Sequence, residues 1–292
     1  METTNNVTQT IIDTINTIFE NLFSSIDNNL YSVLDNITFI GSDILNDKNF
    51  ENIFGTSTSN GILLIANSLL LAYILYYSIK YLVSHFTYSR TDTPGSFILK
   101  LVLCGICMNF SFFIMQFVLD LNFNITSAIR TLGENLFGKE VSFSQLITTI
   151  NTTASVDTNS INIFSIDGLI KGTLTLSLLN LVFSYSFRYV MVKVFVLLSP
   201  FAFLSLSLTH SSWFFRTWAK NLFSLLFIQI IVSLVLLVLF SMEFSDTDLF
   251  TKFIYIGGIY VLIKANSFVR EFIGGVSTNI SQTVNSFTNL KI

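Results

Sequence analysis

The chain has 292 residues, of which 51% are hydrophobic and only 11% are charged, and its mean hydropathy is +0.66. This composition excludes an ordinary soluble domain and indicates an all-α, polytopic integral membrane protein. A formal charge of −3 gives no basic surface for direct nucleic-acid binding, and two Cys with two His exclude a disulfide framework and the usual metal sites.

Residues 1–60 contain no signal-peptide pattern but have a helical period. Acidic residues recur every seven positions on one face, and apolar residues recur every three or four positions on another, which predicts amphipathic helices. The apolar face is formed by Ile11, Ile15, Ile18, Leu22, Ile26, Leu30, Val33 and Ile37. Because the polar face is acidic, we expect the helices to pack against another protein or, equally, against this chain's own extracytoplasmic loop.

Four later stretches are apolar for long enough to cross a bilayer core of about 30 Å. They are residues 61–83, 101–119, 221–240, and 253–263 with a flank to 268. A fifth region, residues 169–208, is longer and is interrupted by charges and a proline, so its composition fits either one crossing or two.

The distribution of Lys and Arg favours one crossing there, and therefore about five in all, with the N-terminus outside and the C-terminus in the cytoplasm. Ten of the fifteen basic residues, but only two of the eighteen acidic ones, then lie on the inner side. A sixth crossing would move Arg216, Lys220 and Lys264 outside and reverse this bias. The helix rise agrees, because a helix from Leu169 reaches Arg188 after about 28 Å.

This topology divides the chain into five parts, of which the first is an extracytoplasmic N-terminal segment and the last a cytoplasmic tail. The parts are residues 1–60, the first two transmembrane helices with a cytoplasmic loop (61–119), an extracytoplasmic loop with short helices (120–168), three transmembrane helices with a cytoplasmic elbow around 199–216 (169–268), and the tail (269–292). In the loop, Ser142 and Gln145 have the spacing of a helix capping box.

Several residues are expected to hold the last three helices at the inner membrane surface. Pro200 removes a backbone donor, which predicts a break or kink. The aromatic and basic residues that follow are typical of a helix start at headgroup level. The elbow and this helix start comprise Pro200, Trp213, Arg216 and Trp218, and the expected inner-interface anchors are Arg188, Lys193 and Lys220.

Small and polar residues inside the apolar stretches predict helix packing. Gly168 and Gly172 have the G-x-x-x-G spacing, and Gly257 and Gly258 lie together in the last crossing. Other polar residues at membrane depth are Asn180 and Gln229. Because no carboxylate lies well inside any span, we expect these amides to link helices rather than to couple ion transport.

The sequence offers no catalytic constellation. Cys104 and Cys107 have the C-x-x-C spacing of thiol–disulfide enzymes, but no second pair accompanies them, and we expect both to be small buried hydrophobes. The H-E-x-x-H, G-x-S-x-G and P-loop motifs are absent. We therefore expect no enzyme activity, no cofactor and no metal.

The layout resembles the TrbL family, the polytopic inner-membrane subunits of type IV secretion and conjugation systems. The resemblance covers residues 169–239: a long apolar helix, the elbow Leu197-Leu198-Ser199-Pro200-Phe201-Ala202-Phe203, the turn Trp213-Phe214-Phe215-Arg216-Thr217-Trp218, and another long helix. It implies a homo-oligomeric ring in the bacterial cytoplasmic membrane. Such a ring would contact cytoplasmic ATPases and an extracytoplasmic pilus or stalk component, and would meet DNA or nucleoprotein cargo only indirectly.

We therefore expect a structural and channel-forming subunit of a type IV secretion machine that transfers DNA in conjugation. One alternative is a stand-alone solute channel or permease, for which the sequence should offer related broken helices or a buried charge, and it shows neither. A second alternative is a pore-forming, holin-like protein whose N-terminal amphipathic helix inserts into the membrane.

Overall fold

The computed structural model describes residues 10, 14–15, 17–18, 33–55, 61–87, 94–153, 166–208, 211–242 and 249–273. Every regular element in these ranges is a helix, which confirms the all-α fold. Four helices there are long and apolar enough to cross a membrane: Ile62–Phe86, Ser111–Phe137, Leu176–Leu197 and Ser212–Ser241. The fold is therefore that of a helical membrane protein.

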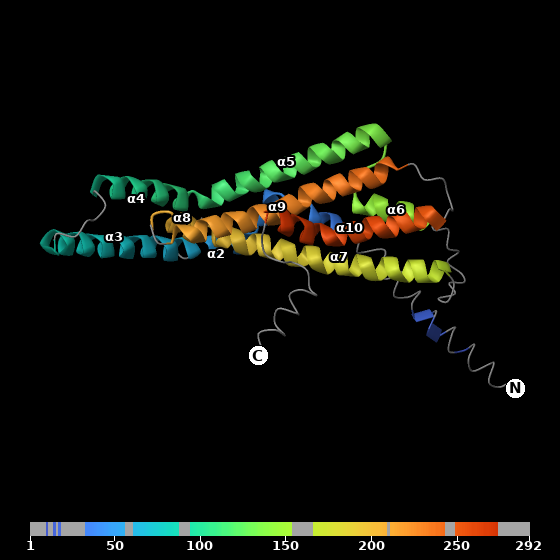
Figure 1. Cartoon of the computed structure of the whole chain (residues 1–292), viewed down its shortest axis with the longest axis horizontal. Helices are drawn as coiled ribbons and strands as arrows, with labels where there is room; N and C mark the ends of the chain where they lie inside the picture. Colours follow the sequence, from blue (N-terminus) through green and yellow to red (C-terminus); the bar gives the residue numbers. More distant parts are fainter. Residues whose placement is uncertain are drawn as a thin grey trace.

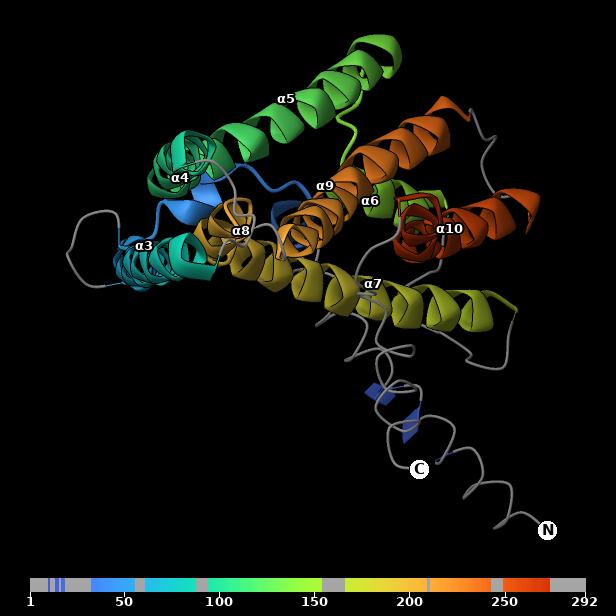
Figure 2. The same ribbon diagram turned by 60° about the vertical axis from the view of Figure 1, so that its left-hand side comes forward.

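The elements form an elongated bundle with α9 at its centre (Figures 1 and 2). In chain order they are η1 (Ser42–Leu45), α2 (Lys48–Phe54), α3 (Ile62–Thr87), α4 (Pro94–Asn109), α5 (Ser111–Phe137), α6 (Phe143–Thr153), α7 (Ile166–Leu197), α8 (Ser199–Ser205), α9 (Ser212–Ser241) and α10 (Leu249–Ile273). Helix α9 packs against α5, α7 and α10, whereas α3 packs against α2, α4 and α8. Figure 1 shows α3 and α4 projecting beyond the ends of α7 and α9.

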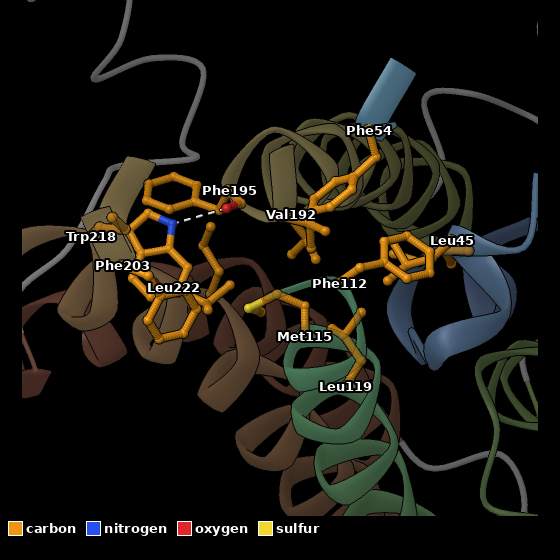
Figure 3. Packing of buried hydrophobic residues seen from close by; sticks show 14 of the residues in the cluster. Leu45, Phe54, Phe112, Met115, Leu119, Val192, Phe195, Phe203, Trp218 and Leu222 are labelled. Atoms are coloured by element: carbon orange, nitrogen blue, oxygen red, sulfur yellow. Dashed lines mark hydrogen bonds between the residues drawn. The ribbon is translucent and has the colours of Figure 1, made fainter. Parts of the chain in front are cut away.

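Two hydrophobic clusters of buried side chains form the core. The first lies between α6, α10, the middle of α7 and the second half of α9, and includes Tyr185 and Val232. The second lies between the end of α7, α8, the beginning of α9 and the beginning of α5, and includes Val192 and Trp218. Figure 3 shows the second cluster, in which Phe54 and Phe112 approach to 5.0 Å between ring centroids.

The second expected crossing, residues 101–119, is not one helix. Helix α4 ends at Asn109 and α5 begins at Ser111, so the helix is interrupted at Phe110. Helix α5 then continues as far as Phe137, through residues that the sequence assigned to the extracytoplasmic loop. Gly138 ends it in the left-handed conformation, with φ of 64°, which a residue with a side chain rarely adopts.

The break expected near Pro200 is present. Helix α7 ends at Leu197, and the short α8 begins at Ser199 with Pro200 in its first turn, where a proline fits because its missing N–H would have no helical partner. The side chain of Pro200 lies in the buried interior. Helix α8 packs against α3, α4 and α9. The elbow therefore joins the bundle to α3 and α4, the two projecting helices, which we name the hairpin.

Residues 33–54, which we name the inserted segment, pack against the bundle and place several apolar side chains in its core. Leu34 and Phe39 belong to the first cluster, and Ile40, Leu45 and Phe54 belong to the second. The sequence treated residues 1–60 as one separate segment outside the helices. The structure instead uses part of it as core, because its apolar side chains fill the space between α5, α7 and α9.

The two adjacent glycines of α10 have different surroundings. A Cβ at Gly258 would lie only 2.5 Å from Leu239 Cδ2 on α9, whereas a Cβ at Gly257 would meet nothing within 4 Å. Gly258 therefore permits the close approach of α9 and α10, as the sequence predicted for this pair. Gly257 faces an apolar groove between the same two helices.

Valine at these two positions should have unequal effects. Gly258→Val places a branched side chain against Leu239, and we expect it to lower the free energy of unfolding by about 1–3 kcal/mol. Gly257→Val, the matched control, should change it much less. Thermal unfolding of the purified variants in detergent measures both, and equal losses would show that the close approach at Gly258 is unimportant.

Candidate functional site

Arg188 lies on α7 with none of its side chain exposed. Its Nε donates to the carbonyl oxygen of Leu225 at 2.8 Å, Nη1 donates to that of Thr38 at 2.9 Å, and Nη2 donates to Gln229 Oε1 at 3.0 Å. Within the described ranges, no carboxylate pairs with the guanidinium. Because a buried charge is costly unless its donors find acceptors, these three bonds are what allow Arg188 to be inside.

Gln229 on α9 extends this arrangement to a third helix. Its Oε1 also accepts from the backbone N–H of Ile40 at 3.2 Å. Its Nε2 donates to the carbonyl oxygen of Ile40 at 3.3 Å and to Thr126 Oγ1 on α5 at 3.1 Å. We name Arg188, Gln229, Thr126 and the backbone of Thr38 and Ile40 the polar node; it joins α5, α7, α9 and the inserted segment.

The polar node lies between the two hydrophobic clusters. On α7, Tyr185 belongs to the first cluster and Val192 to the second, about one turn to either side of Arg188. On α9, Val232 and Leu225 flank Gln229 in the same way. The node is therefore a polar layer across an otherwise apolar core, and its hydrogen bonds set how the helices align.

The inserted segment is not helical at residues 39–41, between a helical stretch at 33–38 and η1. Buried backbone outside regular helices needs hydrogen-bond partners from elsewhere in the protein. Gln229 supplies two of them at Ile40, and Asp120 Oδ1 on α5 accepts from Ser42 N–H at 3.1 Å. Side chains thus replace the helical hydrogen bonds that this backbone lacks.

A cavity of about 920 Å³ lies beside the inserted segment, bounded also by α5 and α7. Seven charged side chains line it: Asp35, Asp43, Asp47, Asp120, Glu140, Arg130 and Lys193. Arg130 pairs with Glu140 at 3.0 Å and lies 4.3 Å from the ring centroid of Phe39. Lys193 Nζ lies 5.2 Å from the ring centroid of Tyr189. The carboxylates outnumber the cations, so the cavity is polar and acidic.

Asp35 links the inserted segment to the beginning of α6 through two hydrogen bonds. Its two carboxylate oxygens accept from the backbone N–H groups of Phe143 at 2.9 Å and Ser144 at 3.1 Å. Burial raises the pKa of the Asp35 carboxyl, while these N–H groups and Arg130 oppose that rise. Ser142 Oγ accepts from Gln145 N–H at 3.1 Å, so the helix start predicted from their spacing is confirmed.

The residues expected at the elbow have different environments. Trp218 is buried in the second cluster, and its Nε1–H donates to the carbonyl oxygen of Phe195 on α7 at 2.9 Å (Figure 3). Trp213 is 64% exposed, and Arg216 and Lys220 are exposed too. Trp218 therefore ties α9 to α7. The anchoring of Trp213, Arg216 and Lys220 at a membrane surface stays a prediction. Arg188 was expected to be such an anchor too, but its side chain is fully buried in the protein, and Lys193 lines the cavity.

The other predicted residues are dispersed. Gly168 and Gly172 lie on α7, where a Cβ at Gly172 would meet nothing within 4 Å, and Asn180 is exposed on the same helix. Ile15 and Ile18 are exposed. The remaining residues of the N-terminal face, Ile11, Leu22 and Ile26, lie outside the described residues. Of the predicted helix-packing residues, Gln229 and Gly258 make the interhelical contacts that the structure describes.

The part of the chain that the structure describes holds no group of three or more His, Cys, Asp or Glu residues placed to bind a metal ion. Sequence reasoning named Arg188 and Gln229 separately but missed that they meet. Their shared partners are backbone atoms of Thr38 and Ile40, and backbone atoms leave no signature in a sequence. The available signal was the coincidence of one Arg and one Gln at similar depth in two neighbouring apolar helices.

No protein-family model matches the chain, and no curated protein matches its sequence. Its function is therefore inferred from its own residues.

Gln229→Leu should destabilise the protein strongly. The change leaves the N–H and the carbonyl of Ile40 unpaired and removes an acceptor from Arg188, and each buried unsatisfied group costs about 1–3 kcal/mol. We expect a loss of about 3 kcal/mol or more. Gln116→Leu, at a half-buried glutamine of α5 outside the node, is the control. Equal melting temperatures for the two variants would contradict a stabilising role for the node.

Proposed function

We propose that the chain is a non-enzymatic structural and channel-forming subunit of a type IV secretion machine that transfers DNA in conjugation, located in the bacterial cytoplasmic membrane. The observation that supports this most is the order α7, break at Leu198, α8 with Pro200, and α9 with Trp218 near its beginning. It covers the same residues that resemble the TrbL family. The break gives the chain a fixed elbow between two long apolar helices.

The proposed subunit works as a homo-oligomeric ring. Large exposed apolar side chains run along α3, α5 and α9, among them Leu71, Phe117 and Phe223. In a membrane such faces contact lipid or neighbouring copies of the chain. We expect the exposed Arg216 and Lys220 to face the secretion ATPases on the cytoplasmic side, and the acidic N-terminal helices to face a pilus or stalk component outside.

The proposed topology has five crossings: α3, α4 together with α5, α7, α9 and α10. The five cannot all cross the same bilayer in one rigid arrangement, because the hairpin of α3 and α4 projects beyond the ends of α7 and α9 (Figure 1). The proposal therefore includes a turn of the hairpin toward the bundle when the protein is inserted. The break at Phe110 gives the chain a place to bend.

Cysteine labelling tests this topology. In a chain with Cys104→Ala and Cys107→Ala, Asn46→Cys should react with an impermeant thiol reagent added to intact cells, because Asn46 is exposed and precedes α3, the first crossing of the proposal. Thr209→Cys should react only after the cells are opened. The reverse pattern would end the five-crossing proposal.

DNA transfer tests the function itself. In-frame deletion of the gene should abolish transfer from healthy donor cells, and a plasmid copy should restore it. Pro200→Leu lets the helix of α7 continue, so it should lower transfer and the yield of the native-size complex while membrane insertion stays unchanged. Pro94→Leu, at the beginning of α4, is the control. Unchanged transfer after deletion would exclude a role in DNA transfer.

A stand-alone solute channel or permease is the second candidate. One feature expected for it is present in the structure, a fully buried charge at Arg188. Solute uptake by cells that express the chain alone would favour it over the secretion subunit.

A further inference from the structure

We propose that Lys80 and Lys100, one on each helix of the hairpin, together bind the phosphate group of an anionic phospholipid. This inference goes beyond the proposed secretion function and does not depend on it, because it concerns one copy of the chain and its lipid. It requires only that the hairpin contacts lipid, which the exposed apolar side chains of α3 and α4 favour.

Contacts between side chains fix how α3 and α4 lie against each other in the hairpin (Figure 1). The rings of Tyr77 and Phe97 stack, with 3.4 Å between their centroids and 6° between their planes. At the end of α4, Asn67 Nδ2 donates to Asn109 Oδ1 at 3.2 Å, and Asn109 Nδ2 donates to Asn67 Oδ1 at 3.3 Å. The two helices are therefore antiparallel, with Tyr77 level with Phe97.

Lys80 and Lys100 lie near this stacked pair, because each follows one of the two rings by three residues. Three residues turn a helix by about 300°, and in antiparallel helices this rotation brings both positions to the same side of the pair. Helical side chains lean toward the N-terminus of their own helix, so Lys80 leans back toward Tyr77 and Lys100 toward Phe97. The Cα atoms of the two lysines are about 9 Å apart along the hairpin, and their side chains lean toward each other.

The charge of this surface favours an anion. The sequences of α3 and α4 contain no Asp or Glu, so the two ammonium groups have no negative partner on the hairpin. Both lysines are exposed, and neither forms an ion pair with another of the described residues. Their like charges repel each other, and an anion between them relieves that repulsion. A zwitterionic lipid fits less well, because no carboxylate is present here to receive its cationic group.

The surroundings of the two lysines favour a lipid phosphate over a free one. From Ile62 to Lys80, α3 rises by about 27 Å, which matches one hydrocarbon core and puts Lys80 at headgroup level. Tyr76 and Tyr81 are exposed within about one turn of Lys80, as tyrosines are at the boundary between headgroups and hydrocarbon. Apolar side chains near both lysines are exposed and can contact acyl chains; they are Leu75, Ile79, Leu99 and Leu103.

A cross-link tests the placement of the two lysines without lipid. In the full chain with Cys104→Ala and Cys107→Ala, a short bismaleimide should join Lys80→Cys to Lys100→Cys. Val102 is exposed five residues after Phe97, which puts it on the opposite side of α4, so Lys80→Cys with Val102→Cys is the control and should not be joined. Equal cross-linking of the two pairs would contradict the geometry on which the site rests.

Lipid titration of the purified full chain tests the ligand. Native mass spectrometry in detergent compares the binding of phosphatidylglycerol, which is anionic, with that of phosphatidylcholine, which is zwitterionic. We expect the chain to retain phosphatidylglycerol under conditions that release phosphatidylcholine, and an excess of inorganic phosphate should not displace it. Displacement by inorganic phosphate would show a site for a soluble anion instead, and equal retention of the two lipids would overturn the proposal.

Single and double variants test whether the two lysines share one lipid. Lys80→Gln and Lys100→Gln should each lower the affinity for phosphatidylglycerol about fivefold and leave the affinity for phosphatidylcholine unchanged. Because both bind one phosphate, the double variant should weaken the same single lipid molecule rather than two. Lys48→Gln with Lys139→Gln, at two exposed lysines outside the hairpin, is the control with the same change of charge. Weakening of two bound lipids in the double variant, or an equal effect of the control, would contradict a shared site.

Discussion

The burial of the Arg188 guanidinium is the constraint on which the rest of the structure depends. No carboxylate among the described residues neutralises it, so its stability inside the bundle comes from carbonyl and amide oxygens alone. Two of its three acceptors lie on α9 and the third lies on the inserted segment. The N–H donors of Arg188 therefore find their acceptors only when α7, α9 and that segment are together. The polar node thus specifies one arrangement of these elements, whereas burial of apolar surface alone would permit others.

This requirement explains the architecture around the node. The two hydrophobic clusters meet at one polar layer, and the inserted segment crosses that layer where its backbone leaves the helical form. Gln229 is suited to the place because an amide can donate and accept at once, satisfying both backbone groups of Ile40. A polar cavity lies beside the same layer and is lined in part by residues of the segment itself.

The proposed secretion function uses the elbow and the two long helices that it joins. The elbow at Pro200 and the contact of Trp218 with Phe195 give a rigid connection between two long helices, which suits a subunit that must hold a fixed shape in a ring.

The sequence by itself determined the helical membrane class, the apolar stretches of α3, α7 and α9, and the break near Pro200. These follow from the local pattern of apolar residues and from the missing proline N–H. Only the tertiary structure decided that α5 begins at a break at Phe110, that Gly258 packs where Gly257 does not, and that residues 33–54 enter the core. Those outcomes depend on which helix surfaces meet. The atoms of Thr38 and Ile40 that bind Arg188 and Gln229 belong to the backbone, so no pattern of side chains in the sequence reveals them.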